Sequence, residues 1–115
     1  MPMHEAKIIL PKFDNQGKAI DHLHPLIAES ILANFGGYSV QDICGVWKDP
    51  DSGRVYQDKS SAYVIAADWS GMNPVKLRWI ARRAAVLLSQ ECIYMALPSG
   101  VEFIGQEAVQ PAIAA

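Results

Sequence analysis

The stretch at residues 45–60, GVWKDPDSGRVYQDKS, decides the fold because it joins two runs of strand-forming residues through a turn. The flanking runs, residues 38–48 and 54–67, are rich in the β-branched and aromatic side chains that favour strands. Between them, Pro50 presets φ for a turn, and Gly53 can take the positive φ that closes it. The stretch therefore predicts a β-hairpin.

A calcium loop is the alternative interpretation of the same turn, because it contains several aspartates. Counting from Asp49, Asp51 stands at a ligand position of an EF-hand loop. Gly53, however, falls one position too early, and Ser60 stands where the loop requires a bidentate Glu. We therefore predict a plain turn and no metal site.

A strand and a helix are expected before the hairpin, and a helix and a strand are expected after it. Pro25 in a first turn and Gly36 at an end are typical of one helix, and Asn73 followed by Pro74 is typical of the start of another. The expected order is strand 7–10, a helix from Asp21 to Gly36, the two hairpin strands, helix 73–90, and short strands 91–97 and 101–104.

This β-α-β-β-α-β order predicts an α+β, ferredoxin-like fold, an antiparallel sheet with two helices on one face, plus a short extra C-terminal strand. We expect a single domain over residues 1–105 and a frayed tail over residues 106–115. Apolar side chains repeat with helical spacing in both helices and should pack on the sheet. The predicted core side chains of the helices are Ile27, Ile31, Phe35, Leu77, Ile80 and Ala84.

Three features of the sequence resemble small bacterial and phage proteins of unknown function that have a ferredoxin-like fold. They are the G-x-W strand with Gly45 and Trp47, the turn that ends in Gly53-Arg54, and the later segment QECIYMAL at residues 90–97. The resemblance extends over about residues 7–97. It implies the same fold and supplies no catalytic residues.

Composition limits the cellular setting. The chain has 115 residues and a net charge of −2, which argues against a general nucleic-acid binder. Cys44 and Cys92 lack CxxC spacing and no signal peptide is evident, so we expect reduced thiols and a cytoplasmic location. No apolar run is long enough to cross a membrane.

His22 and His24 would point apart on a helix and have no third ligand nearby, so we expect no metal and no cofactor.

The hairpin strands carry the candidate ligand contacts. If Lys48 pairs with Arg54, alternation places Tyr56 and Asp58 on one face of the sheet and Trp47 on the other. A bare face that carries such side chains can line a ligand cleft, although solvated strand residues beside a core Trp are the simpler interpretation. The ligand-cleft candidates are Asp42, Trp47, Tyr56 and Asp58.

The second helix carries a second apolar stripe, opposite its core face. Trp and Arg in such a stripe are enriched at protein interfaces. The interface candidates are Val75, Trp79, Arg82 and Val86. Because no catalytic motif is recognisable either, the leading hypothesis is a non-enzymatic module that binds itself, as a homodimer, or another protein.

Two alternatives to this hypothesis remain open. The first is a small-molecule-binding protein or enzyme with a pocket between the sheet and the helices. The second is contact with an anion or nucleic acid through the basic side chains of the second helix, Lys76, Arg78, Arg82 and Arg83.

Overall fold

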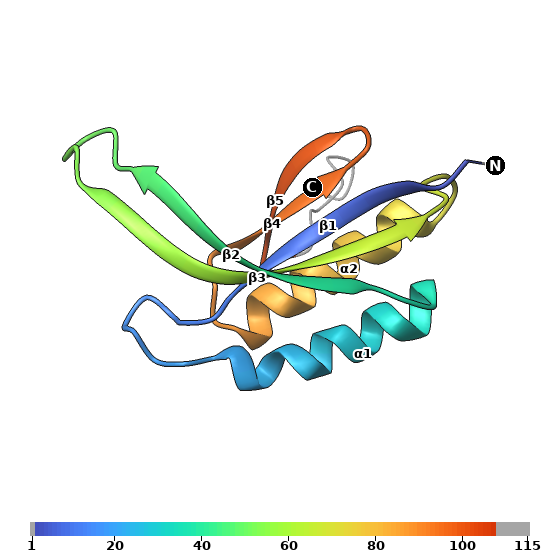
Figure 1. The fold of residues 1–115 in the computed structure, drawn as a ribbon, viewed down its shortest axis with the longest axis horizontal. Coiled ribbons are helices and arrows are strands. Elements are labelled where there is room, and N and C mark those ends of the chain that lie inside the picture. The colour runs from blue at the N-terminus through green and yellow to red at the C-terminus, as the bar shows by residue number, and fades with distance from the viewer. Residues whose placement is uncertain (1, 108–115) are drawn as a thin grey trace, which may run out of the picture.

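The computed structural model describes residues 2–107, which form a five-stranded antiparallel sheet with two helices against one face (Figure 1). The elements are β1 (His4–Pro11), a 3-10 turn η1 (Asp21–Leu23), α1 (His24–Phe35), β2 (Ser39–Lys48), β3 (Val55–Ala67), α2 (Asn73–Leu87), β4 (Cys92–Leu97) and β5 (Gly100–Gly105). The strand order is β2-β3-β1-β4-β5. This confirms the predicted α+β, ferredoxin-like plan, with β5 added beside β4.

The helix boundaries follow from local chemistry. Gly36 ends α1 with φ of 82°, and its N–H donates to the carbonyl of Leu32. At the start of α2 the cap residue is Met72, one residue before the predicted Asn73. The Asn73 side chain instead donates to the Asp68 carbonyl at 2.7 Å, which ties the helix start to the end of β3. Neither helix of the described residues is long and apolar enough to cross a membrane.

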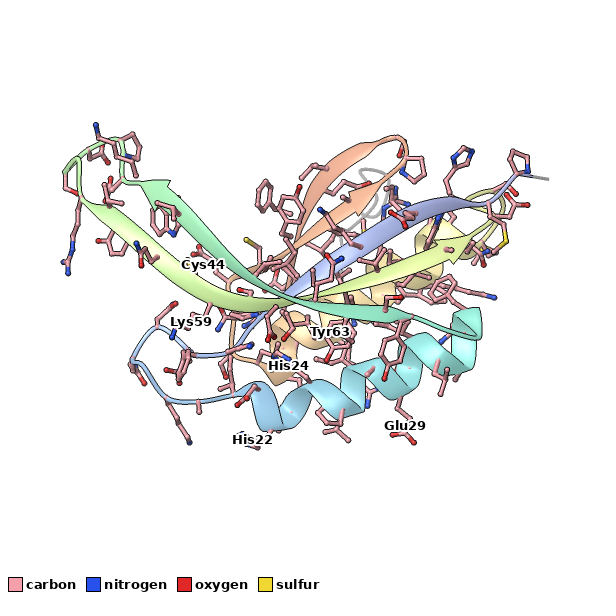
Figure 2. The ribbon with its side chains drawn as sticks, viewed as in Figure 1. His22, His24, Glu29, Cys44, Lys59 and Tyr63 are labelled. Atoms are coloured by element: carbon pink, nitrogen blue, oxygen red, sulfur yellow. The ribbon has the colours of Figure 1, made fainter. Side chains whose placement is uncertain are left out.

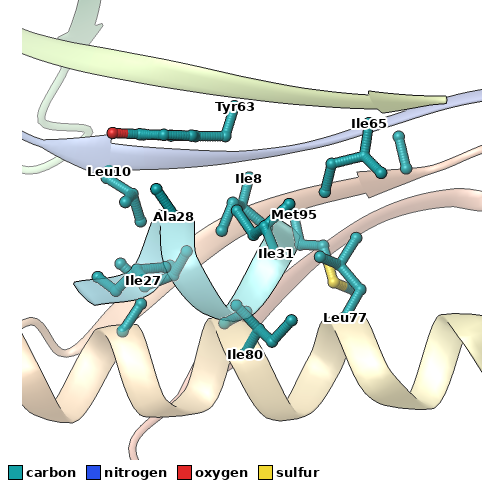
Figure 3. Packing of buried hydrophobic residues seen from close by; sticks show 14 of the residues in the cluster. Ile8, Leu10, Ile27, Ala28, Ile31, Tyr63, Ile65, Leu77, Ile80 and Met95 are labelled. Carbon is teal, nitrogen blue, oxygen red and sulfur yellow. The ribbon is translucent and has the colours of Figure 1, made fainter. Parts of the chain in front are cut away.

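The core lies between the sheet and the helices (Figure 3). Period-two alternation along β1 turns Ala6, Ile8 and Leu10 toward the helices. The predicted helix residues meet them: Ile27, Ile31, Leu77, Ile80 and Ala84 are buried. Phe35 is only partly buried and packs against Trp69, with ring centroids 5.3 Å apart.

The hairpin register is one residue away from the predicted one. Lys48 pairs with Val55 instead of Arg54, because the Asp49 N–H donates to the Arg54 carbonyl at 2.8 Å and holds Arg54 in the turn. The Gly53 N–H also donates to the Asp49 carbonyl, and Gly53 has φ of 74°. The turn itself is therefore as predicted, but the slip exchanges the faces of the β3 residues.

The far half of the hairpin projects beyond the rest of the sheet, at the upper left of Figure 1. β1 pairs with β3 only from Ser60 to Ala67, and the Lys59 carbonyl accepts from the Lys12 N–H at 2.9 Å, so residues 55–58 pair with β2 alone. At the other end of the chain, most of the predicted frayed tail, residues 108–115, lies outside the described residues. Gln106, the first residue of that predicted tail, is described, and its side chain donates to the Gln90 carbonyl at 2.8 Å.

Candidate functional site

The face of the sheet opposite the helices carries a groove. On β1 the side chains that alternate with the core residues are Glu5 and Lys7, and both are exposed. A hollow of about 350 Å³ lies along them. The adjoining strands contribute Ser39 and Gln41 from β2, Val64 from β3 and Ala96 from β4.

The floor of the groove is made of short side chains. Lys7 stands between its strand partners Val64 and Ala96, and Glu5 stands opposite Ala66. A second hollow, of about 310 Å³, shares Glu5 and Val64 with the first and extends toward the Gly36–Gly37 turn and Tyr38. We call the two hollows together the open-face groove.

Glu5 and Lys7 give the groove both signs of charge. Every other side chain that lines the two hollows is uncharged. The ion pairs within residues 2–107 are Lys12–Asp42 and Arg78–Glu102, so Glu5 and Lys7 have no charged partner in this part of the chain. The same residues hold no group of three His, Cys, Asp or Glu side chains suited to a metal ion.

The predicted ligand-cleft residues lie elsewhere. Because of the register shift, Trp47, Tyr56 and Asp58 share one face of the projecting hairpin, which corrects the predicted separation of Trp47 from the other two. Trp47 stacks on Tyr56 with ring centroids 4.5 Å apart, and its Nε1 donates to Asp58 Oδ2 at 2.8 Å. Arg54 lies over the Tyr56 ring at 5.1 Å.

Asp42 is on the opposite face of β2 from that cluster. Its Oδ1 accepts from Lys12 Nζ at 2.7 Å. None of the four predicted residues lines the open-face groove. Their role as ligand contacts stays a prediction.

The layer between the sheet and the helices, where a pocket was the alternative expectation, is filled with side chains. Tyr63 and His24 lie there between β3 and α1 (Figure 2). His24 Nε2 is 2.8 Å from the Pro11 carbonyl oxygen, and the two rings meet edge to face. Burial is the main cause that raises the pKa of Tyr63, and the nearby Tyr38 raises it further. The first hollow described above is lined by strand residues, and the second also touches Phe35 at the end of α1.

The interface candidates are on the outer side of α2, as their spacing predicts. Trp79 is 59% exposed and Val86 is 55% exposed, while Val75 and Arg82 are half-buried. All four line shallow hollows beside the helix, one of which Phe103 of β5 also borders. Whether a partner covers this side of α2 stays a prediction.

Two of the four basic side chains proposed for anion contact are already engaged. Arg78 binds both carboxylate oxygens of Glu102, each at 2.9 Å. Arg83 donates to Ser30 Oγ at 2.9 Å. Glu102 therefore offsets the charge of Arg78, whereas Arg83 keeps its positive charge.

Sequence reasoning missed the groove because it begins strand one at Lys7, whereas β1 begins at His4. Glu5 was thereby left outside the sheet. The signal was present in the run EAKIIL, where Glu5 and Lys7 alternate with Ala6 and Ile8. The contributions of β2, β3 and β4 are far apart in the sequence and become visible only in the folded chain.

Two solved structures share this fold over nearly the whole chain. One is a phage SAM lyase in complex with S-methyl-5′-thioadenosine, with a TM-score of 0.66 and 15% identity. The other is a phage SAM lyase in the apo state, with a TM-score of 0.63 and 14% identity. Each comparison covers 95% of this chain and 93% of the other. Neither a scan of protein-family models nor a search of curated proteins finds a match.

These neighbours correct the leading hypothesis. The prediction of a non-enzymatic module that binds itself or another protein is corrected in its first part, because the structures that share the fold are those of an enzyme, one of them with a small molecule bound. Self-association stays a prediction. The finding favours the first alternative, a small-molecule-binding protein or enzyme. The predicted resemblance to phage proteins is supported at the level of the fold.

Proposed function

We propose that this chain is a small-molecule lyase that binds S-adenosylmethionine in the open-face groove and releases S-methyl-5′-thioadenosine. The observation that carries the proposal is the near-complete overlap with the phage SAM lyase, at 95% of this chain and 93% of the other. With so little of either chain outside the overlap, the strands and helices of the neighbour's fold have counterparts here.

The chemistry of the neighbour's ligand supports a specific bond cleavage. S-Adenosylmethionine carries a positively charged sulfur bonded to the methyl group, the adenosyl group and the amino-acid chain. Breaking the bond between sulfur and the amino-acid chain returns the electron pair to sulfur and leaves S-methyl-5′-thioadenosine. The carbon that loses sulfur gains a new bond within the fragment: either a double bond, with a neighbouring proton lost to a base, or a ring bond to the fragment's own carboxylate oxygen. The four-carbon fragment then departs as the second product.

The open-face groove is a suitable place for such a ligand. Its two hollows, of about 310 and 350 Å³, fall at the lower end of the roughly 300–1,000 Å³ range of small-molecule sites. Val64 and Ala96 provide short apolar side chains on the floor of the groove, beside the charged and polar groups that would contact the ligand.

The test is release of S-methyl-5′-thioadenosine from S-adenosylmethionine by the purified full chain, followed by chromatography over time. Heat-denatured protein is the control, because the sulfonium also decomposes slowly in water. Steady release that depends on native protein is the expected result. Absence of release above the control would refute the lyase activity.

A pair of variants tests the location. Ala66→Trp places an indole in the groove from an exposed position, so we expect most of the activity to be lost. Val55→Trp adds the same indole at an exposed position of the projecting hairpin and should leave the activity unchanged. Full activity in a folded Ala66→Trp variant would place the site outside the groove.

A further inference from the structure

We infer that Glu5 and Lys7 select the ligand by its charge: the Glu5 carboxylate faces a cationic sulfur, and the Lys7 ammonium faces a carboxylate at the other end of the same ligand. The inference rests on the proposed function, because it takes the open-face groove as the site. It names the two residues that distinguish a sulfonium amino acid from analogues that lack one of its charges.

The placement of the two side chains follows from β1. Residues two apart on a strand lie on one face, and their Cα atoms are roughly 7 Å apart. Both side chains rise beside short neighbours, Ala66 next to Glu5, and Val64 and Ala96 next to Lys7. Each charged group can therefore reach over the floor of the groove without displacing another side chain.

The ligand carries the complementary charges at a matching distance. In a sulfonium amino acid such as S-adenosylmethionine, four single bonds separate the positive sulfur from the carboxylate carbon, a span of about 5 Å. Side chains from Cα positions roughly 7 Å apart can contact both ends of that span. The neutral oxygens of Ser39 and Gln41, on the neighbouring strand, can accept hydrogen bonds from the ligand ammonium.

Pairing within the protein does not compete with this role. Neither Glu5 nor Lys7 takes part in the ion pairs formed by residues 2–107, and the side chains around them are uncharged. Both are exposed in the absence of ligand, so a bound ligand would remove part of the water around them and strengthen the attraction. Replacing either residue with a neutral one should affect ligands according to their charge.

Three ligands separate the two charges. S-Adenosylmethionine has the sulfonium and the carboxylate, S-adenosylhomocysteine has the carboxylate with a neutral sulfur, and S-methyl-5′-thioadenosine has neither. Their affinities for the full chain are measured by calorimetry at low temperature and low salt, with product formation quantified in the same samples. Low salt is chosen because an exposed charge pair is screened at high salt.

For Glu5→Gln we expect the affinity for S-adenosylmethionine to fall about five- to tenfold, with the other two ligands unaffected. For Lys7→Met we expect a similar fall for both ligands that carry the carboxylate, and none for S-methyl-5′-thioadenosine. Glu29→Gln on α1 and Lys59→Met on β3 make the same charge changes away from the groove and should alter none of the affinities (Figure 2).

The outcomes distinguish this inference from the proposed function. If the wild-type chain binds none of the three ligands, the proposed function and the inference both fail. If it binds S-adenosylmethionine but the two variants weaken all ligands equally or none, the inference fails and the proposed function stands. If the charge-dependent pattern is present without release of S-methyl-5′-thioadenosine, the inference stands and the lyase activity fails.

Discussion

At the scale of single residues, Glu102 and Arg78 form the clearest electrostatic contact, a bidentate pair between β5 and α2. Hydrogen bonding to Arg78 lowers the pKa of Glu102, and the same bonds raise the pKa of Arg78. Because both side chains are more than one-third exposed, solvent screens the pair and its contribution to stability is modest.

We expect Glu102→Gln to lower the free energy of unfolding by about 0.2–1 kcal/mol at pH 7. A carboxylate with a lowered folded-state pKa stabilises the fold above its unfolded pKa, about 4.3 for Glu, and this contribution is lost as the pH falls through the folded pKa. Urea denaturation of both proteins from pH 7 to pH 2 should thus show the difference shrinking toward zero. A constant difference would mean that the pair does not act through charge.

Ile80 tests the packing of α2 on the sheet. It is 6% exposed within the core, so Ile80→Ala should lower the free energy of unfolding by about 2–5 kcal/mol in urea denaturation. Val86→Ala on the outer side of the same helix should cost less than about 0.5 kcal/mol. Equal losses for the two variants would show that the helix is rotated relative to the structure.

At the scale of elements, the end of α1 depends on one backbone conformation. Gly36 has φ of 82°, whereas Gly37 has no positive φ, and a Cβ at either position meets no atom within 4 Å. Gly36→Ala should therefore destabilise the protein by about 1–2 kcal/mol through backbone strain alone. Gly37→Ala should be neutral or stabilise by up to about 1 kcal/mol. Thermal denaturation compares them, and a neutral Gly36→Ala would contradict the strain argument.

The sequence predicted elements more reliably than the pairing between them. Helical spacing and the residues at helix ends located α1 and α2, because these signals are local. Strand register was off by one residue at the hairpin, since the turn hydrogen bond from Asp49 to Arg54 cannot be read from the residue types. That single step moved Tyr56 and Asp58 to the face of Trp47.

The groove was beyond sequence reasoning for a related reason. Its side chains come from four strands, and the central role of β1 depends on its pairing with both β3 and β4. Glu5 and Lys7 have the correct alternation in the sequence, but alternation alone does not tell which neighbours stand beside them. Short side chains such as Ala66 and Ala96 carry no functional signal in the sequence, and only the folded chain shows that they form the floor of the groove.

At the scale of the whole molecule, stability should be uneven along β3. Residues 60–64 lie between β1 and β2, whereas residues 55–58 pair only with β2 in the projecting hairpin. Local opening needs less free energy where few contacts hold the backbone. We expect amide hydrogens of residues 55–58 to exchange orders of magnitude faster than those of residues 61–64, measured by nuclear magnetic resonance or mass spectrometry.

The same strand supplies the control for this measurement. If both halves of β3 exchanged at equal, slow rates, the projecting hairpin would have to be covered in solution by another molecule. Repeating the experiment over a range of protein concentrations would then show whether a second copy provides that cover.

The alternation along β1 also has a consequence for protein engineering. Ala6, Ile8 and Leu10 pack the core, and Glu5 and Lys7 stand on the opposite face, so adjacent positions of one strand serve the interior and the surface separately. Substitutions at Glu5 and Lys7 should therefore change the charge of the open face while the packing of the interior stays intact. The surface of this strand can be redesigned one residue at a time without any redesign of the core.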